Sequence, residues 1–112
     1  MAAAAAAQLY SCSIRQIEYA AEMALEHHLG LTCDPVHGLV QVPCIERNAF
    51  AAGTAIYVAE YVSFTDGSHL VSFDQVVVVM MQTGVDMPSL YRETSEGGLA
   101  KFFKTPKKNS SE

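Results

Sequence analysis

Two cysteines, Cys33 and Cys44, are the residues of this sequence best suited to do chemistry, and they stand eleven positions apart. They lie in residues 31–48, which also hold two of the four prolines and a His-Gly pair. Soft thiolates bind zinc and iron–sulfur clusters. The spacing differs from the CxxC pair of a zinc knuckle, and two buried, inert cysteines fit it better than a metal site does. Spacing alone therefore leaves metal binding and simple burial open.

The histidines are weaker candidates for ligands. His27 and His28 are expected in the last turn of a helix, where the helix dipole stabilises an imidazolium. His37 precedes a glycine and fits either a turn or a metal ligand. His69 is expected in a surface connection without a partner.

A few charged residues could also form sites. Residues 46–48, Glu-Arg-Asn, could bind a carboxylate or cap a helix. Arg92 with Glu93 fits a surface helix pair, and residues 94–98 could form an anion-binding turn. The sequence contains no Ser-His-Asp order, phosphate loop or HExxH pattern that would indicate another chemistry.

Apolar spacing and capping signals predict a mostly α-helical chain in which the two cysteines lie at opposite ends of a long loop. Helices are expected over residues 2–10, 14–29, 43–62, 73–82 and 87–94. Capping boxes formed by Ser13 with Gln16 and by Ser72 with Gln75 begin the second and fourth helices. The β-branched run 76–79 favours a strand, but the cap and a following glycine favour the helix.

Glycines are expected to end several helices. Gly30 is placed just after the second helix and Gly84 after the fourth, while Gly97-Gly98 would end the last one. Asp86 is expected to cap the start of that last helix.

Two of the predicted helices have distinct faces. The apolar face of the second comprises Ile14, Ile17, Ala21, Ala24, Leu25 and His28. Its other side carries Glu18, Glu22 and Glu26, which we expect to be solvated because like charges four residues apart repel one another. The third helix has a small-residue face that permits close packing, made of Ala49, Ala52, Gly53, Ile56 and Ala59.

The loop over residues 31–43 has no sustained periodicity. Turns are expected at Asp34-Pro35 and at His37-Gly38, followed by a short extended piece over residues 39–42. Pro43 favours a helix start, which places Cys44 at a helix N-terminus, where the macrodipole favours a thiolate. A loop this long in a compact domain is uncommon unless it is functional or disordered.

Composition limits the class of protein. The 112 residues fit one domain, for which we expect an ordered part over residues 1–104 and a disordered tail over 105–112. The net charge of −5 argues against nucleic-acid binding, which needs a basic face. No export signal or membrane span is expected, and three cysteines suit a reduced, cytoplasmic protein better than a disulfide framework.

The loop and its flanks resemble a known family. The stretch AAEMALEHHLGLTCDPVHGLVQVPCIERNA is similar to the C-terminal part of the α domain of bacterial iron–sulfur L-serine dehydratases, also called L-serine ammonia-lyases. The resemblance continues through VSFDQV, TGVDM and YRETSEGGLA and covers roughly residues 13–100. The fold it implies is a mostly α-helical fragment of the serine dehydratase α chain.

The resemblance implies an activity and a cofactor. Members of this family convert L-serine to pyruvate and ammonia, a step in serine catabolism and gluconeogenesis, without pyridoxal phosphate. They use a [4Fe-4S] cluster held by three cysteines, with one open iron acting as a Lewis acid. Carried over onto the motifs TCDPV and VPCIERN, Cys33 and Cys44 would be two of the cluster and metal ligands.

The same resemblance leaves parts of the enzyme unaccounted for. The family's first cluster cysteine lies upstream of its Ala-rich helix, Cys12 does not match it, and the family's β domain has no counterpart here. We therefore expect a C-terminal fragment that lacks the third ligand and is inactive alone. The alternatives are a split-chain subunit completed by a partner, and a non-enzymatic zinc protein using Cys33, Cys44 and a histidine such as His37.

Overall fold

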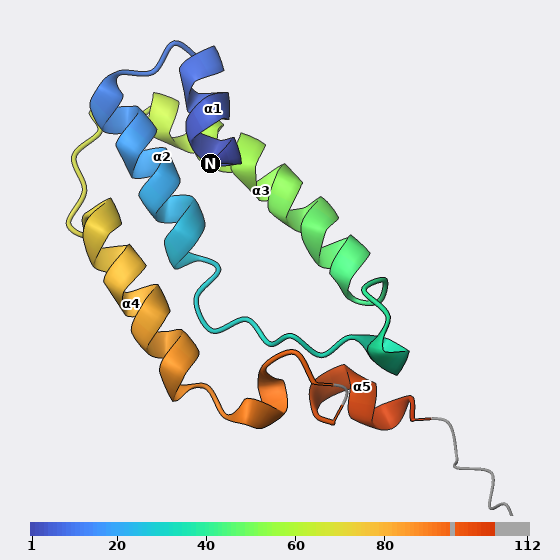
Figure 1. Cartoon of the computed structure of the whole chain (residues 1–112). Helices are drawn as coiled ribbons and strands as arrows, with labels where there is room; N and C mark the ends of the chain where they lie inside the picture. Colours follow the sequence, from blue (N-terminus) through green and yellow to red (C-terminus); the bar gives the residue numbers. More distant parts are fainter. Residues whose placement is uncertain (95, 105–112) are drawn as a thin grey trace, which may run out of the picture. The chain divides into compact units, whose positions relative to one another are not determined.

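The computed structural model describes residues 1–94 and 96–104 and contains only helices there, as predicted (Figure 1). The tail 105–112, predicted to be disordered, lies outside the described residues. The elements are α1 (Ala2–Leu9), α2 (Ile14–Glu26), η1 (Val36–Gly38), α3 (Cys44–Ser63), α4 (Phe73–Asp86), η2 (Ser89–Tyr91) and α5 (Gly98–Phe102), where η marks a short 3-10 turn. No helix within this part of the chain combines the length and apolar character needed to cross a membrane.

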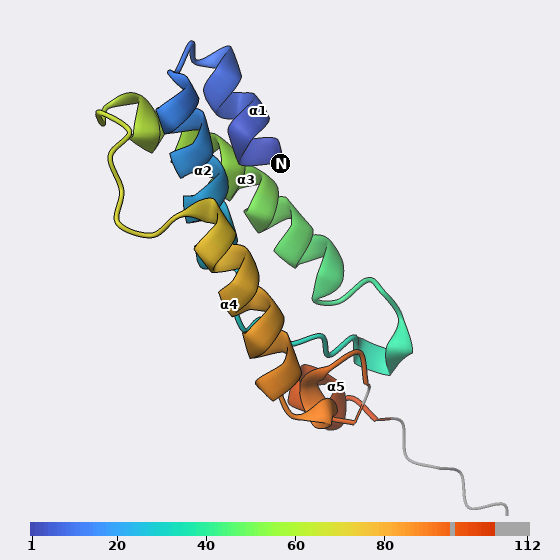
Figure 2. The same cartoon turned by 60° about the vertical axis from the view of Figure 1, so that its left-hand side comes forward.

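The chain forms two compact units. Unit 1 comprises Met1–Leu31 and Asn48–Asp86, and unit 2 comprises Thr32–Arg47 with the described residues from Met87 onward. Helix α3 begins in unit 2 and continues into unit 1. In unit 1, α2 packs against both α1 and α4 (Figures 1 and 2).

Both predicted capping boxes form. The Gln16 N–H donates to Ser13 Oγ at 3.2 Å, and the Ser13 N–H donates to Gln16 Oε1 at 2.8 Å. Ser72 and Gln75 make the same reciprocal pair at 2.9 and 3.2 Å. Gln16 Nε2 also donates to the Val62 and Thr65 carbonyls, at 3.0 and 2.7 Å. The N-terminus of α2 therefore also binds the C-terminal end of α3.

The core of unit 1 is built from small residues: Ala3, Ala7, Ala20, Ala55, Val58, Ala59 and Val62. Short side chains let helix backbones approach closely. The small-residue face predicted for α3 is largely wrong, because only Ala59 of that set is buried, and Ala52 and Gly53 are exposed. Alanines occur on several sides of this helix, so composition alone does not identify the packed side.

The predicted face of α2 is also partly wrong. Ile14 is 86% exposed, whereas Ala20 is fully buried and Ile17 is packed against the core. The helix ends at Glu26 instead of running to Gly30. His27 and His28 donate through Nδ1 to the Met23 and Ala24 carbonyls, at 2.7 and 2.5 Å, and so terminate it.

The C-terminal boundaries differ from the prediction as well. Helix α4 contains the β-branched run, as predicted, but it continues through Gly84 to Asp86, so Asp86 is not a cap. Pro88 then takes an extended conformation, and only the single turn η2 follows. A proline disfavours helix at the residue before it, which ends α4 here. The Gly97-Gly98 pair begins α5 instead of ending a helix.

Glu22 is buried, with 2% of its surface exposed, although the sequence pattern predicts a solvated side chain. Because α2 contacts two other helices, more of its surface is buried than its one predicted apolar face would bury. Burial raises the pKa of the Glu22 carboxyl to about 7, helped by a hydrogen bond and repulsion from Glu26. Glu22 Oε1 has no hydrogen-bond partner among the described residues.

His69 also has partners, contrary to the prediction. Its ring stacks on Tyr19 with centroids 4.6 Å apart, and its Nδ1 donates to the Gly67 carbonyl at 3.0 Å. Its Nε2 lies 3.6 Å from Glu18 Oε1. The connection before α4 is therefore held against α2.

The raised pKa of Glu22 predicts a loss of stability as pH rises. The carboxyl keeps its proton up to about pH 7 when folded but only up to about 4.5 when unfolded. The contribution of the protonated Glu22 carboxyl to the free energy of unfolding is thus full below pH 4.5 and is lost by about pH 7. Glu22→Gln should remove this fall, which at about 1.4 kcal/mol per pH unit is at most about 3–4 kcal/mol.

Urea unfolding at several pH values measures this effect. Glu60→Gln, an exposed position on α3, is the matched control and should behave as wild type. The same pH dependence in Glu22→Gln and wild type would contradict the prediction.

Candidate functional site

Both candidate ligands lie in unit 2. Cys33 is exposed in irregular backbone, and Cys44 is half-buried as the first residue of α3, at the predicted helix N-terminus. Both are free thiols. Cys12 is half-buried and lies in unit 1.

The loop between the two cysteines is compact. The Val36 N–H donates to the Val42 carbonyl at 2.8 Å, which closes the loop. His37 and Gly38 both take positive φ, 56° and 72°, so the turn predicted there forms. Residues 40–42 are a turn as well, and the extended piece predicted for residues 39–42 is absent because the loop folds back to make this bond.

Asp34, directly after Cys33, makes three side-chain hydrogen bonds within unit 2. Only 3% of its surface is exposed. Its Oδ1 accepts from Arg47 Nη1 at 2.8 Å and from Thr32 Oγ1 at 3.1 Å, and its Oδ2 accepts from the Leu99 N–H at 2.7 Å. Arg47 Nη1 also donates to the Thr32 carbonyl at 2.7 Å. One carboxylate thus joins the cysteine loop, the first turn of α3 and α5.

These donors keep Asp34 ionised. Burial alone would raise the pKa of its carboxyl, but the bonds from Leu99, Arg47 and Thr32 outweigh burial and lower it below the ordinary value. A buried charge with matched donors is stable, whereas the same charge left unpaired is strongly destabilising. The sequence pattern missed this role of Asp34, although it allowed residues 46–48 to bind a carboxylate.

The C-terminal segment of unit 2 packs along the cysteine loop (Figure 1). The Cys33 N–H donates to the Tyr91 carbonyl at 2.9 Å, and α5 contacts η1. Gly98 permits this approach, because a Cβ there would collide with the Asp34 carboxylate, whereas a Cβ at Gly97 would meet Leu90 within the C-terminal segment itself. Gly98 also has a φ of +57°, which favours glycine.

The structure does not supply a third ligand. Among residues 1–94 and 96–104, no group of three or more His, Cys, Asp or Glu side chains could hold a metal ion. His37 is exposed, and no bond of its side chain to either cysteine is found. Arg92 and Glu93, predicted as a helix pair, instead follow η2 in non-helical backbone.

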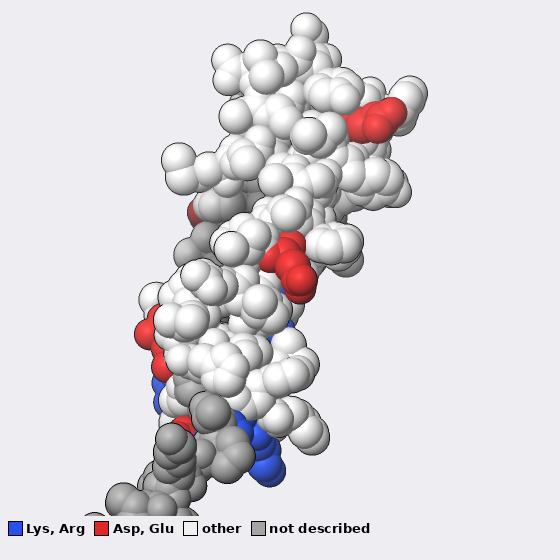
Figure 3. Space-filling model, turned by 90° about the vertical axis from the view of Figure 1, so that its right-hand side faces the viewer, with Lys and Arg blue, Asp and Glu red and all other residues white. Residues whose placement is uncertain are grey.

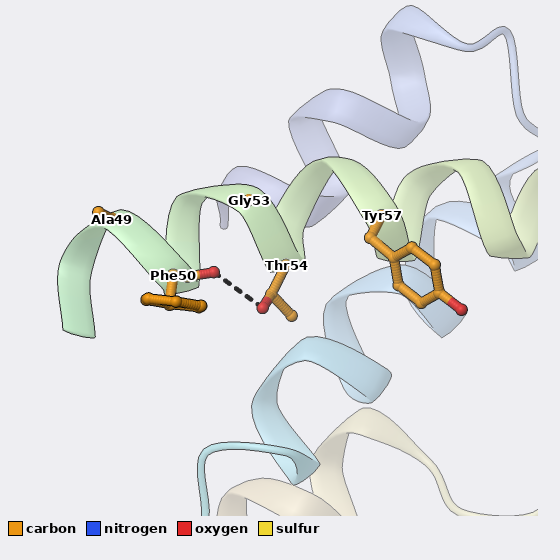
Figure 4. A pocket seen from close by; sticks show the side chains of 5 residues that line it. All are labelled: Ala49, Phe50, Gly53, Thr54 and Tyr57. Carbon is orange, nitrogen blue, oxygen red and sulfur yellow. Dashed lines mark hydrogen bonds between the residues drawn. The ribbon is translucent and has the colours of Figure 1, made fainter. Parts of the chain in front are cut away.

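The hollow on α3 in unit 1 offers little polar chemistry. It has a volume of about 370 Å³ and is lined by Ala49, Phe50, Gly53, Thr54 and Tyr57 (Figure 4). Of its two hydroxyl groups, that of Thr54 already donates through Oγ1 to the Phe50 carbonyl at 2.9 Å. Few charged side chains lie on the side of the molecule seen in Figure 3. An apolar, open hollow of this kind suits packing better than binding of a charged substrate.

The chain belongs to the family described as serine dehydratase alpha chain, whose sequence model matches residues 1–100. This confirms the family indicated by the cysteine motifs. Over 100 residues the chain is 57% identical to the L-serine dehydratase of Mycobacterium bovis, 55% to that of Streptomyces coelicolor and 54% to L-serine dehydratase 2 of Escherichia coli K12. Each match covers 89% of this chain but only 22% of the relative, so the chain spans about a fifth of their length.

Removing the charge of Asp34 should loosen unit 2. In Asp34→Asn, Arg47 loses its carboxylate partner, and we expect a loss of about 1–2 kcal/mol, less than for a fully buried pair because the Arg47 side chain is 39% exposed and solvent screens its charge. Hydrogen exchange at the Leu99 amide, which donates to Asp34, should quicken accordingly. Asp86→Asn, exposed at the end of α4, is the control. Unchanged protection at Leu99 would contradict this role of Asp34.

Two glycine substitutions should have opposite effects. Gly98→Ala places a methyl group against Asp34 at positive φ and should destabilise the chain by at least about 1 kcal/mol. Gly53→Ala has no neighbouring atom within 4 Å and lies inside α3. It should stabilise the chain by about 0.5–1 kcal/mol. Thermal unfolding of both variants measures the difference, and equal effects would refute the packing described for Gly98.

Proposed function

We propose that this chain supplies Cys33 and Cys44 as two thiolate ligands of a [4Fe-4S] cluster in an L-serine ammonia-lyase that converts L-serine to pyruvate and ammonia. The observation that carries the proposal is the bracing of both cysteines within one unit. Asp34 is bonded to the first turn of α3 through Arg47, so the Cys33 loop and Cys44 are held on a common frame. Membership of the serine dehydratase family supports the choice of reaction.

The donor set fits part of such a cluster. Iron–sulfur clusters take cysteine thiolates, and both thiols are free, one exposed and one half-buried. The described residues offer no third ligand grouped with them. We therefore propose that the third thiolate comes from a partner: the parts of the α and β portions of the same enzyme that this chain does not include.

The cluster supplies, when bound, a Lewis-acidic iron that stabilises the departing hydroxyl of serine, without pyridoxal phosphate. The chain's own residues position and expose the ligands. Asp34 and Arg47 restrain the loop, and the Cys33 N–H is bonded to Tyr91, so the exposed thiol stays on a backbone fixed at both sides. A rigid ligand frame reduces the reorganisation needed on binding.

The chain alone is proposed to be inactive, since two thiolates hold a four-iron cluster insecurely. Its place would be serine catabolism and gluconeogenesis in the cytoplasm, as part of a larger enzyme. The limited coverage of its relatives is consistent with this role, since they extend well beyond the matched region.

Anaerobic reconstitution with iron and sulfide tests the proposal. The chain is mixed with a polypeptide containing the rest of a relative such as the E. coli enzyme, and cluster absorbance and serine-dependent pyruvate are measured. We expect both signals to fall at least tenfold in Cys33→Ser and in Cys44→Ser. Cys12→Ser, in unit 1, should retain them.

Two results would reject the proposal in different ways. A full cluster and pyruvate formation by the chain alone would show that no partner ligand is needed. Colourless protein with stoichiometric zinc after aerobic purification would reject the iron–sulfur assignment in favour of a zinc protein.

A further inference from the structure

A hollow of about 510 Å³ in unit 2 is lined by Ser89, Arg92, Glu93 and Thr94. Its volume falls within the range of about 300–1,000 Å³ common for small-molecule sites. It differs from the hollows of unit 1, which are lined mainly by apolar residues and contain no cation. It therefore offers charges of both signs and hydroxyl groups in one place.

Arg92 is free to bind a ligand. The other arginine of unit 2, Arg47, is bonded to Asp34 and to the Thr32 carbonyl. Arg92, by contrast, is exposed and makes no ion pair or hydrogen bond to another described residue through its guanidinium. A guanidinium presents its donors in a planar fork that matches a carboxylate.

The backbone places this hollow beside Cys33. The Cys33 N–H donates to the Tyr91 carbonyl at 2.9 Å, and Arg92 is the next residue along the chain. The turn η2 is closed by the Tyr91 and Arg92 N–H groups, which donate to the Pro88 and Ser89 carbonyls at 3.0 and 3.1 Å. The position of Arg92 is therefore tied to that of a proposed cluster ligand.

Glu93 completes the hollow from an unusual backbone conformation. Its φ of 55° lies in the left-handed region, a backbone conformation that residues other than glycine rarely adopt. Such conformations concentrate at functional sites. Thr94 Oγ1 donates to the Leu90 carbonyl at 2.6 Å and so fastens the chain directly after Glu93.

We propose that Arg92 and Glu93 form the binding subsite for the charged groups of a free α-amino acid. Arg92 binds the carboxylate, and Glu93 accepts hydrogen bonds from the ammonium group. This inference rests on the proposed function, in which the amino acid is L-serine and its hydroxyl must lie near the ligands Cys33 and Cys44. Arg92 is a binding residue that positions the substrate relative to the proposed cluster ligands Cys33 and Cys44.

Titration of the isotope-labelled chain with L-serine, followed by amide NMR shifts, tests this subsite without any cluster. We expect saturable shifts at residues 89–94 and at the Cys33 amide. In Arg92→Met the apparent Kd should rise at least tenfold, and in Arg92→Lys less. Arg15→Met, an exposed arginine of unit 1, is the matched control and should bind as wild type. L-serinamide, which lacks the carboxylate, should bind wild type as weakly as L-serine binds Arg92→Met.

Several outcomes would overturn the subsite. These are the absence of saturable shifts in wild type at millimolar L-serine, equal affinity in Arg92→Met, or equal affinity for L-serinamide. Cluster reconstitution with the partner polypeptide separates this failure from failure of the proposed function. Arg92→Met should form the cluster normally, because Arg92 is not a ligand. Normal cluster formation without serine binding at Arg92 rejects only the subsite. Serine binding at Arg92 in the titration, with no cluster formed on reconstitution with the partner polypeptide, rejects only the iron–sulfur proposal.

Discussion

The buried carboxylate of Asp34 is the interaction on which unit 2 depends. It accepts hydrogen bonds from its own loop, from α3 and from α5, and so joins three segments of unit 2. Several apolar side chains of unit 2, among them Leu39, Val40 and Phe102, remain exposed. Hydrogen bonds to one charged side chain therefore hold the segments of unit 2 together, whereas the packing of alanine and valine side chains holds the helices of unit 1 together. A site held by directional bonds is defined more tightly than one held by non-directional apolar contact.

Features encoded over a few residues could be predicted from the sequence. Both capping boxes, the turn at His37-Gly38 and the position of Cys44 at a helix N-terminus depend on local backbone chemistry, and all four form. The family could be identified from the cysteine motifs for a similar reason, because they form one continuous stretch. The role of Cys33 and Cys44 as ligands stays a prediction.

Features that depend on distant partners could not be predicted. Glu22 is buried because α2 packs against two neighbouring helices. The regular spacing of glutamates along α2 does not reveal how many helices pack against it. Asp34 before a proline looks like a turn residue, and its bond to Leu99 spans 65 positions. Gly97-Gly98 looked like a helix end because its real constraint, the space needed by Leu90 and Asp34, lies outside the local sequence.

The bond between Asp34 and Leu99 also affects the order of assembly. During synthesis, Cys33 and Cys44 leave the ribosome well before residue 99, since the chain emerges from its N-terminus. Until then the Asp34 carboxylate lacks one of its donors, and α5 cannot cover η1. The bonds that fix the cysteine loop are therefore completed only when residue 99 is available, so the loop is less constrained while the chain is still growing.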